Sequence, residues 1–313
     1  MTTAAQDGTQ RRPTDISVVV PSRNRPRELA RCLAALHEQR TEASYEVIVV
    51  DDGSSPPLDG VLTPDPRLRV VRGPGRGPAR ARNAALQVAR GAIVAFTDDD
   101  TIPDSSWLAA ALSYLNEHPE AVGVEGPTHS TPFDYLEAHS VDRREPGGYV
   151  TANIAFRRSI LLLEGGFSDE FPAPHCEDLD LAFRCLRHGP IGFAPGMLVT
   201  HPPRPLTARQ IIWRGGLGGS DIKLFRRHRD RFPVYARSPP IVLLPARSAW
   251  FWLTELWRRR RSAFQHGQAR KLLAVAIGQF TLVLLTAMRL QLADVATAVS
   301  RLLNARVRDR QTG

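Results

Sequence analysis

The stretch IVAFTDDD, residues 93–100, joins a short apolar run to three consecutive aspartates. A short apolar run that ends in turn residues is typical of a strand buried on both faces of a parallel sheet. Three adjacent carboxylates repel one another, so they need a cation or full solvation to stay together. Mg²⁺ and Mn²⁺ prefer oxygen ligands and usually take one or two carboxylates plus substrate phosphates. The stretch therefore predicts a cation site at a strand end, with a solvated acidic turn as the alternative.

The same pattern of an apolar run followed by polar residues occurs twice earlier in the chain. The run ISVVV at 16–20 precedes PSRNRP at 21–26, and the run VIVV at 47–50 precedes DDGS at 51–54. Taken alone, DDGS could be a turn with an Asx hydrogen bond. In an open parallel sheet, however, ligands bind beyond the carboxyl ends of the strands. We therefore expect the three polar clusters to converge on one ligand.

Helical segments alternate with these strands. Apolar residues at helical spacing predict helices at 27–36, 78–89 and 107–115, and a further apolar run predicts a strand at 68–71. Short apolar strands that alternate with amphipathic helices indicate βαβ units. The predicted fold class is α/β, with a Rossmann-like, mostly parallel sheet covered by helices on both faces.

A glycine-rich turn precedes the second predicted helix. The sequence GPGRGP at 73–78 leads into ARARN at 79–83. Free N–H groups at a helix N-terminus, together with the arginines, suit an anion. Turns of this composition are common before helices, so this motif gains weight only beside the aspartates.

An acidic pair, Glu177 and Asp178, begins another predicted helix within CEDLDLAFR at 176–184, shortly after GGFSDEF at 165–171. Carboxylates in a first helical turn can simply complement the helix dipole. They can also present a general base to a cleft. The residues alone leave both interpretations open.

His201 follows another apolar run, at 197–199, with Thr200 between them. A histidine at a strand end can serve as a metal ligand, although a lone histidine is more often structural. The candidate metal ligands are therefore Asp98, Asp100 and His201.

The net charge of +9 is unevenly distributed. Residues 1–203 carry 20 basic and 27 acidic side chains, whereas residues 204–313 carry 21 basic and 5 acidic ones. Such an asymmetry suggests two parts with different partners. Residues 1–14 are polar and basic, so we expect a flexible N-terminal tail before a domain at 15–203. Three cysteines without a CxxC pair give no disulfide framework, which favours the reducing cytoplasm.

The basic region 204–313 combines tryptophans with apolar segments. Residues 241–257 contain three of the chain's five tryptophans, four arginines follow at 258–261, and residues 272–288 form a run of 17 without charge. A spanning helix needs about 17–25 such residues. A single transmembrane helix, an interfacial helix and a soluble helical cap all remain open. We expect a helical, membrane-associating region, peripheral on the cytoplasmic face of the cell membrane.

These motifs in this order resemble family 2 glycosyltransferases of the GT-A fold. The resemblance runs from about residue 16 to 203 and rests on six stretches: VVVPSRNRP, VIVVDDGS, ARARNAAL, IVAFTDDD, GGFSDEF and CEDLDLAFR. The chain departs from the family in having PSRN, where an aromatic residue usually precedes the asparagine. It also lacks the QxxRW motif of the processive synthases, because Arg209 and Trp213 come in the wrong order. That difference favours transfer of a single sugar per encounter.

The resemblance implies a role for each matching residue. The DxD aspartates fall on Asp98 and Asp100, with Asp99 between them, and would hold a donor nucleotide and a Mn²⁺ or Mg²⁺ ion. The base of the ED pair falls on Asp178, with Glu177 beside it. The remaining residues implied to bind the nucleotide-sugar are Pro21, Arg23, Asn24, Asp51, Arg82 and Asn83.

The function implied is an inverting, metal-dependent transfer of one sugar from a nucleotide-sugar, UDP-linked by family frequency, to a hydroxyl group. The acceptor is expected to be a sugar, a lipid-linked molecule or a cell-envelope glycan at the inner membrane surface. A sugar-phosphate nucleotidyltransferase is an alternative, but no lysine precedes Lys223 to serve its phosphate loop. Another alternative is a non-catalytic membrane or nucleic-acid binding protein, although no nucleic-acid partner is expected. The sugar, acceptor and linkage are not encoded in any recognisable motif.

Overall fold

The computed structural model divides the chain into two compact units, Met1–Arg204 and Pro205–Gly313. The residues it describes are 14–132, 138–171, 173–207, 209–210, 213 and 218–231. The predicted tail, apart from residue 14, and the predicted segments 241–257 and 272–288 lie outside them. Within the described residues, no helix combines the length and apolar character that crossing a membrane requires.

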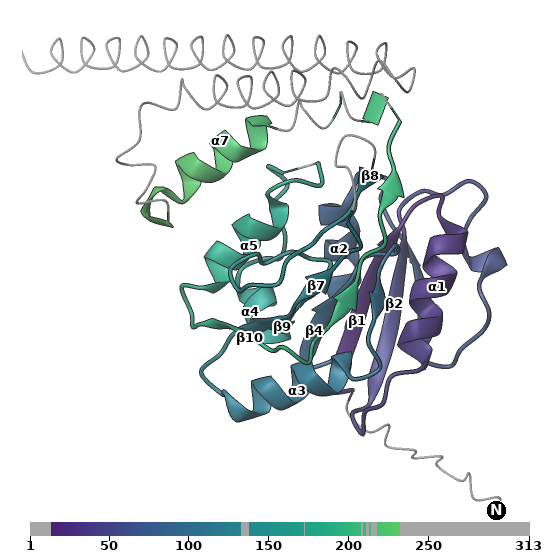
Figure 1. Cartoon of the computed structure of the whole chain (residues 1–313), viewed down its shortest axis with the longest axis horizontal. Helices are drawn as coiled ribbons and strands as arrows, with labels where there is room; N and C mark the ends of the chain where they lie inside the picture. The colour runs from purple at the N-terminus through teal and green to yellow at the C-terminus, as the bar shows by residue number, and fades with distance from the viewer. Residues whose placement is uncertain are drawn as a thin grey trace, which may run out of the picture. The chain divides into compact units, whose positions relative to one another are not determined.

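The first unit is built on a central sheet of seven strands in the order β10-β6-β9-β4-β1-β2-β3 (Figure 1). β9 pairs antiparallel with both of its neighbours, and the other pairings are parallel. The prediction of an α/β fold with a mostly parallel sheet is therefore confirmed for this unit. The strands are β1 (Ile16–Ser22), β2 (Tyr45–Asp51), β3 (Leu68–Arg72), β4 (Ile93–Phe96), β6 (Gly123–Glu125), β9 (Ile154–Arg157) and β10 (Ile191–Phe193).

Helices cover both faces of this sheet because successive strand side chains point to opposite faces. Val18 and Val20 of β1 belong to one core cluster, which includes apolar residues of α1 and α3. Val19 between them belongs to a second cluster with residues of α2, α4 and α5. The helices are α1 (Pro26–His37), α2 (Pro78–Leu86), α3 (Trp107–Glu117), α4 (Arg158–Leu163) and α5 (Glu177–Cys185).

Proline begins the two helices that follow β1 and β3. Pro26 and Pro78 stand at the first position of α1 and α2, where the missing N–H costs no hydrogen bond.

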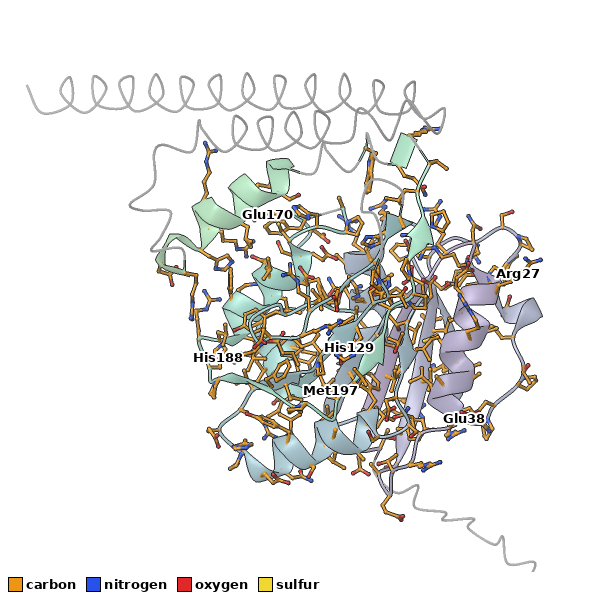
Figure 2. The ribbon with its side chains drawn as sticks, viewed as in Figure 1. Arg27, Glu38, His129, Glu170, His188 and Met197 are labelled. Carbon is orange, nitrogen blue, oxygen red and sulfur yellow. The ribbon has the colours of Figure 1, made fainter. Side chains whose placement is uncertain are left out.

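A small sheet, β5-β11-β7, pairs a late segment of the chain with β5, which follows the aspartates. The carbonyl of His129 in β7, which Figure 2 labels, accepts the backbone N–H of His201, next to β11, at 2.7 Å. The small strands are β5 (Ile102–Pro103), β7 (Thr128–His129) and β11 (Val199–Thr200). The remaining described elements are η1 (Asp59–Val61), β8 (Ala138–His139), β12 (Arg204–Pro205), α7 (Gly218–Arg227) and η2 (Arg229–Arg231).

Candidate active site

The loops after β1, β2 and β4 meet at one edge of the central sheet. Ser22 Oγ donates to Asp99 Oδ2 at 2.7 Å, which joins the first and third loops. The backbone N–H of Asn24 donates to Ser54 Oγ at 2.9 Å, which joins the first and second. The three polar clusters therefore converge as their places after parallel strands predict.

Asp99 is the most enclosed of the three adjacent aspartates, and it faces Arg25. Arg25 Nη1 lies 2.9 Å from Asp99 Oδ1 and 3.1 Å from Asp100 Oδ2. Burial raises the pKa of Asp99 to about 6 despite this contact. The sequence pointed to Arg23, whose side chain is exposed, and missed Arg25 two residues later. The motif PSRNRP contains both arginines, so only the turn geometry distinguishes them.

Asp98, Asp100 and His201 form a candidate metal site. One ligand atom from each of the three side chains lies within 4.8 Å of the others. His201 is buried, and its Nε2 is 3.6 Å from Asp100 Oδ1, while Ser140 Oγ is 3.2 Å from its Nδ1. Two carboxylates and an imidazole fit Mn²⁺ or Mg²⁺ in chemistry and in spacing. The structure therefore brings together all three metal ligands that the sequence predicted.

Arg82 lies between the aspartates and the acidic pair. Its Nη2 is 2.8 Å from Asp98 Oδ1, and its Nη1 is 3.2 Å from Glu177 Oε1. The guanidinium is buried, with only 3% of the side chain exposed, and it lies over the ring of Phe167. Arg82 was predicted to bind the nucleotide, but in this geometry it links two carboxylates.

The acidic pair lies in the first turn of α5 and has raised pKa values. Burial is the main cause for Glu177, whose pKa rises to about 7, and the neighbouring Asp178 adds to the effect. Burial also raises the pKa of Asp178, against the backbone N–H of Leu179 that donates to its carboxylate at 2.8 Å. Carboxylates poised in this way can accept a proton near neutral pH.

Other predicted nucleotide-binding residues make contacts within the protein. Asn83 exchanges two hydrogen bonds with the backbone of Phe167, and Asn24 Oδ1 accepts from the N–H of Ser55. Asp51 accepts the N–H groups of Ser54 and Leu58. Pro21 is half-buried within β1, opposite Val50 of β2.

The glycine-rich turn before α2 binds a carboxylate of the same chain, that of Asp52. Gly75 and Gly77 have φ angles of 69° and 98°, which favour glycine. Their N–H groups donate to the two carboxylate oxygens of Asp52 at 2.7 and 2.8 Å. The predicted anion-binding turn therefore anchors the loop after β2.

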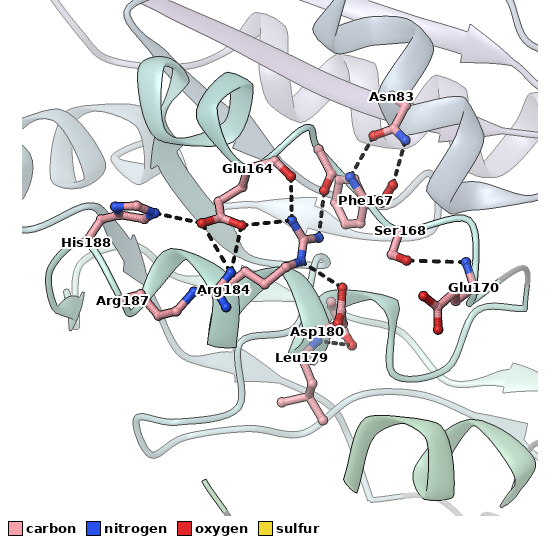
Figure 3. A network of polar contacts seen from close by, with 12 residues as sticks. Asn83, Glu164, Phe167, Ser168, Glu170, Leu179, Asp180, Arg184, Arg187 and His188 are labelled. Atoms are coloured by element: carbon pink, nitrogen blue, oxygen red, sulfur yellow. Dashed lines mark hydrogen bonds and ion pairs between the residues drawn. The ribbon is translucent and has the colours of Figure 1, made fainter. Parts of the chain in front are cut away.

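A polar network fixes α5 to the segment before it (Figure 3). Arg184 donates to the buried Asp180 at 2.9 Å and to the carbonyls of Glu164 and Gly166 at 2.8 and 2.7 Å. The carboxylate of Glu164 also contacts Arg187 and His188. Because Asn83 holds Phe167 at the end of the same segment, α2 and α5 share one anchor. The acidic pair is thereby held in place from both sides.

Comparison with known proteins identifies the family. The sequence model of glycosyl transferase family 2 matches residues 17–167. A hyaluronan synthase of Pasteurella multocida is 26% identical over 223 residues, covering 56% of this chain and 23% of that protein. A chondroitin synthase of Escherichia coli is also 26% identical over 223 residues, covering 56% of this chain and 32% of that protein. The chain thus spans at most about a third of these two relatives. Residues 17–167 form a domain of glycosyl transferase family 2.

Solved structures support the fold. The mannosyltransferase PcManGT of Pyrobaculum calidifontis, in complex with GDP-Man and Mn²⁺, matches with a TM-score of 0.54 and 21% identity. The match covers 86% of this chain and 88% of that one. The mixed α/β architecture with its central sheet is therefore GT-A-like.

Proposed function

We propose that this chain transfers a single sugar from a nucleotide-sugar, a UDP-sugar in the first instance, to a hydroxyl group with inversion of the anomeric centre. The observation that supports this most directly is the chain of contacts from Asp98 through Arg82 to Glu177. It joins a candidate cation site to the acidic pair, of which Glu177 is buried, across 2.8 and 3.2 Å. A transferase of this class needs both sites within reach of one sugar.

We assign binding of the nucleotide-sugar donor to the acidic cluster, which consists of Asp98, Asp99, Asp100 and His201. Asp98, Asp100 and His201 would hold Mn²⁺ or Mg²⁺, which when bound supplies positive charge to the leaving diphosphate. Asp98 is the candidate ligand with the most exposed side chain, at 29%. Its carboxylate is therefore accessible from solvent, as a ligand of a diffusing metal–nucleotide complex must be.

The acceptor end is assigned to the first turn of α5. An acceptor hydroxyl is a weak nucleophile at neutral pH, so a carboxylate must accept its proton within hydrogen-bond reach. Asp178 is the proposed base, and Glu177, paired with Arg82, is proposed to position it. One base with no covalent intermediate gives inversion, by the geometric logic that separates inverting from retaining glycosidases.

The acceptor is proposed to lie at a membrane surface, as a lipid-linked molecule or a cell-envelope glycan. The support is compositional, since residues 204–313 carry 21 basic and 5 acidic side chains. Basic segments bind the anionic cytoplasmic leaflet. Cell fractionation tests this: release by high salt indicates surface charge, release only by detergent indicates insertion, and a protein found wholly in the supernatant contradicts both.

Nucleotide release tests the transferase activity. Purified protein is incubated with UDP-, GDP- and dTDP-sugars and Mn²⁺ or Mg²⁺; GDP-mannose belongs in the panel because PcManGT was solved with GDP-Man. A nucleotidyltransferase would instead release pyrophosphate from a nucleoside triphosphate and a sugar phosphate. A non-catalytic binding protein would release neither product.

A further inference from the structure

Arg204 is a second arginine at the acidic cluster, three residues after His201, and no sequence motif marks it. Its Nε lies 3.3 Å from Asp100 Oδ2. This Nε is buried, yet it forms no hydrogen bond within the described part of the chain. The contact with Asp100 is therefore an ion pair without the geometry of a hydrogen bond.

Arg25 and Arg204 converge on a single oxygen. Asp100 Oδ2 lies 3.1 Å from Arg25 Nη1 and 3.3 Å from Arg204 Nε. Arg25 also has Asp99 as a partner, whereas Asp100 is the partner that the structure gives to Arg204. Two guanidiniums held this close on one carboxylate oxygen are a favourable place for a further anion.

The charges of the cluster indicate which anion fits. Asp98, Asp99 and Asp100 contribute three carboxylates, and the guanidiniums of Arg25, Arg82 and Arg204 contact them. The three carboxylates balance the three guanidiniums formally, although Arg82 is shared with Glu177. A divalent cation on Asp98, Asp100 and His201 would add two positive charges to this cluster. The diphosphate of a nucleotide-sugar carries two negative charges at neutral pH.

We propose that Arg204 is a ligand for the diphosphate of the nucleotide-sugar donor. It binds the phosphate oxygens directly, in addition to the metal ion that Asp98, Asp100 and His201 would hold. The inference rests on the proposed function and assigns one residue of its donor site. The side chain is 27% exposed, so its outer nitrogens are accessible while its Nε stays on Asp100. Bidentate binding of phosphate oxygens is what the planar guanidinium does better than a lysine ammonium.

Nucleotide binding without catalysis tests this assignment. Full-length wild type, Arg204→Ala and Arg204→Lys are titrated with UDP and GDP, and with uridine and guanosine, in EDTA and in Mn²⁺. Arg69→Ala is the matched control, because it removes one exposed arginine of β3 whose contact is the Val88 carbonyl at 3.4 Å. Melting temperatures confirm that each variant is folded, and Arg204→Lys serves if Arg204→Ala is not.

The expected result is a loss of about tenfold or more in diphosphate affinity for Arg204→Ala, as for a hydrogen bond to a charged group. The loss should occur with and without Mn²⁺, with nucleoside binding and affinity for Mn²⁺ alone retained, and Arg204→Lys should lose less. Unchanged diphosphate affinity, or an equal loss of nucleoside or Mn²⁺ affinity, overturns the assignment. If wild type binds neither diphosphate, the proposed function itself fails.

Discussion

Arg82 Nη1 lies 3.2 Å from Glu177 Oε1, although 95 positions separate the two residues in the chain. The other end of the same guanidinium binds Asp98. One buried cation therefore holds the acidic pair of α5 against the turn after β4 that carries the three aspartates. The candidate donor and acceptor ends are thus parts of one electrostatic unit.

Arg82→Ala should destabilise the first unit and abolish activity together. Removing one partner of a buried ion pair leaves an uncompensated charge and costs about 3–5 kcal/mol. Equilibrium unfolding in urea measures this. Arg82→Lys keeps the charge but not the fork that reaches both carboxylates, so it should recover only part of the loss. A cost below about 1 kcal/mol for Arg82→Ala would contradict a linking role.

The network around Arg184 offers a matched pair of substitutions. Arg184 has 6% of its side chain exposed and contacts the fully buried Asp180, whereas Arg187 is 58% exposed, and both contact Glu164 (Figure 3). Arg184→Ala should cost about 3–5 kcal/mol, and Arg187→Ala about 0–1 kcal/mol, because solvent screens the exposed pair. Thermal or urea unfolding of the two variants tests the difference. Equal costs would show that the network does not anchor α5.

Metal affinity should depend on His201. Loss of a residue that only orients a metal-ligating side chain lowers metal affinity about 10–100-fold. Loss of His201 itself should therefore lower the affinity for Mn²⁺ at least as much. Titration of Mn²⁺, followed by electron paramagnetic resonance, measures binding by His201→Ala. Asp104→Asn is the control, because Asp104 binds Ser106 at the start of α3 and does not contact the cluster. If His201→Ala bound Mn²⁺ with wild-type affinity, His201 would not be a metal ligand.

The rate should fall as the solution is made more acidic. A base acts only when deprotonated, and burial raises the pKa of Asp178 above 3.8, its ordinary value. The acidic limb in the pH profile of kcat/KM should therefore lie above pH 3.8. Glu177→Gln should retain the limb, because burial is the chief cause of the shift at Asp178. An acidic limb at or below pH 3.8 would be inconsistent with a base whose pKa is raised by burial.

Strand ends could be predicted from the sequence because apolar runs and turn residues mark them locally. The aspartates at 98–100 and the histidine at 201 were found in this way, and the sheet brings them together. Side-chain partners could not be predicted, because they depend on contacts between distant segments. The contacts of Arg82 with Asp98 and Glu177, and those of the glycine-rich turn with Asp52, follow from no local pattern, while nucleotide binding by Arg82 stays a prediction.

Arg25 and Arg204 illustrate the same limit. Arg25 lies in a motif that the sequence singles out, yet only the left-handed turn at Asn24, with a φ of 55°, separates its position from that of the exposed Arg23. Arg204 lies 104 positions after Asp100, and its approach to that carboxylate depends on how the segment after β11 returns to the aspartates. No local pattern encodes that return.

The most direct test of the account is nucleotide release from the panel of nucleotide-sugars with Mn²⁺, comparing wild type with Asp178→Asn and Asp100→Ala. We expect one donor to be turned over by wild type, with a loss of at least about a hundredfold in either variant, since general base catalysis alone contributes about 10²–10⁴-fold. Asp178→Asn should still bind the donor. Turnover that persists in Asp178→Asn or Asp100→Ala would contradict the assigned roles.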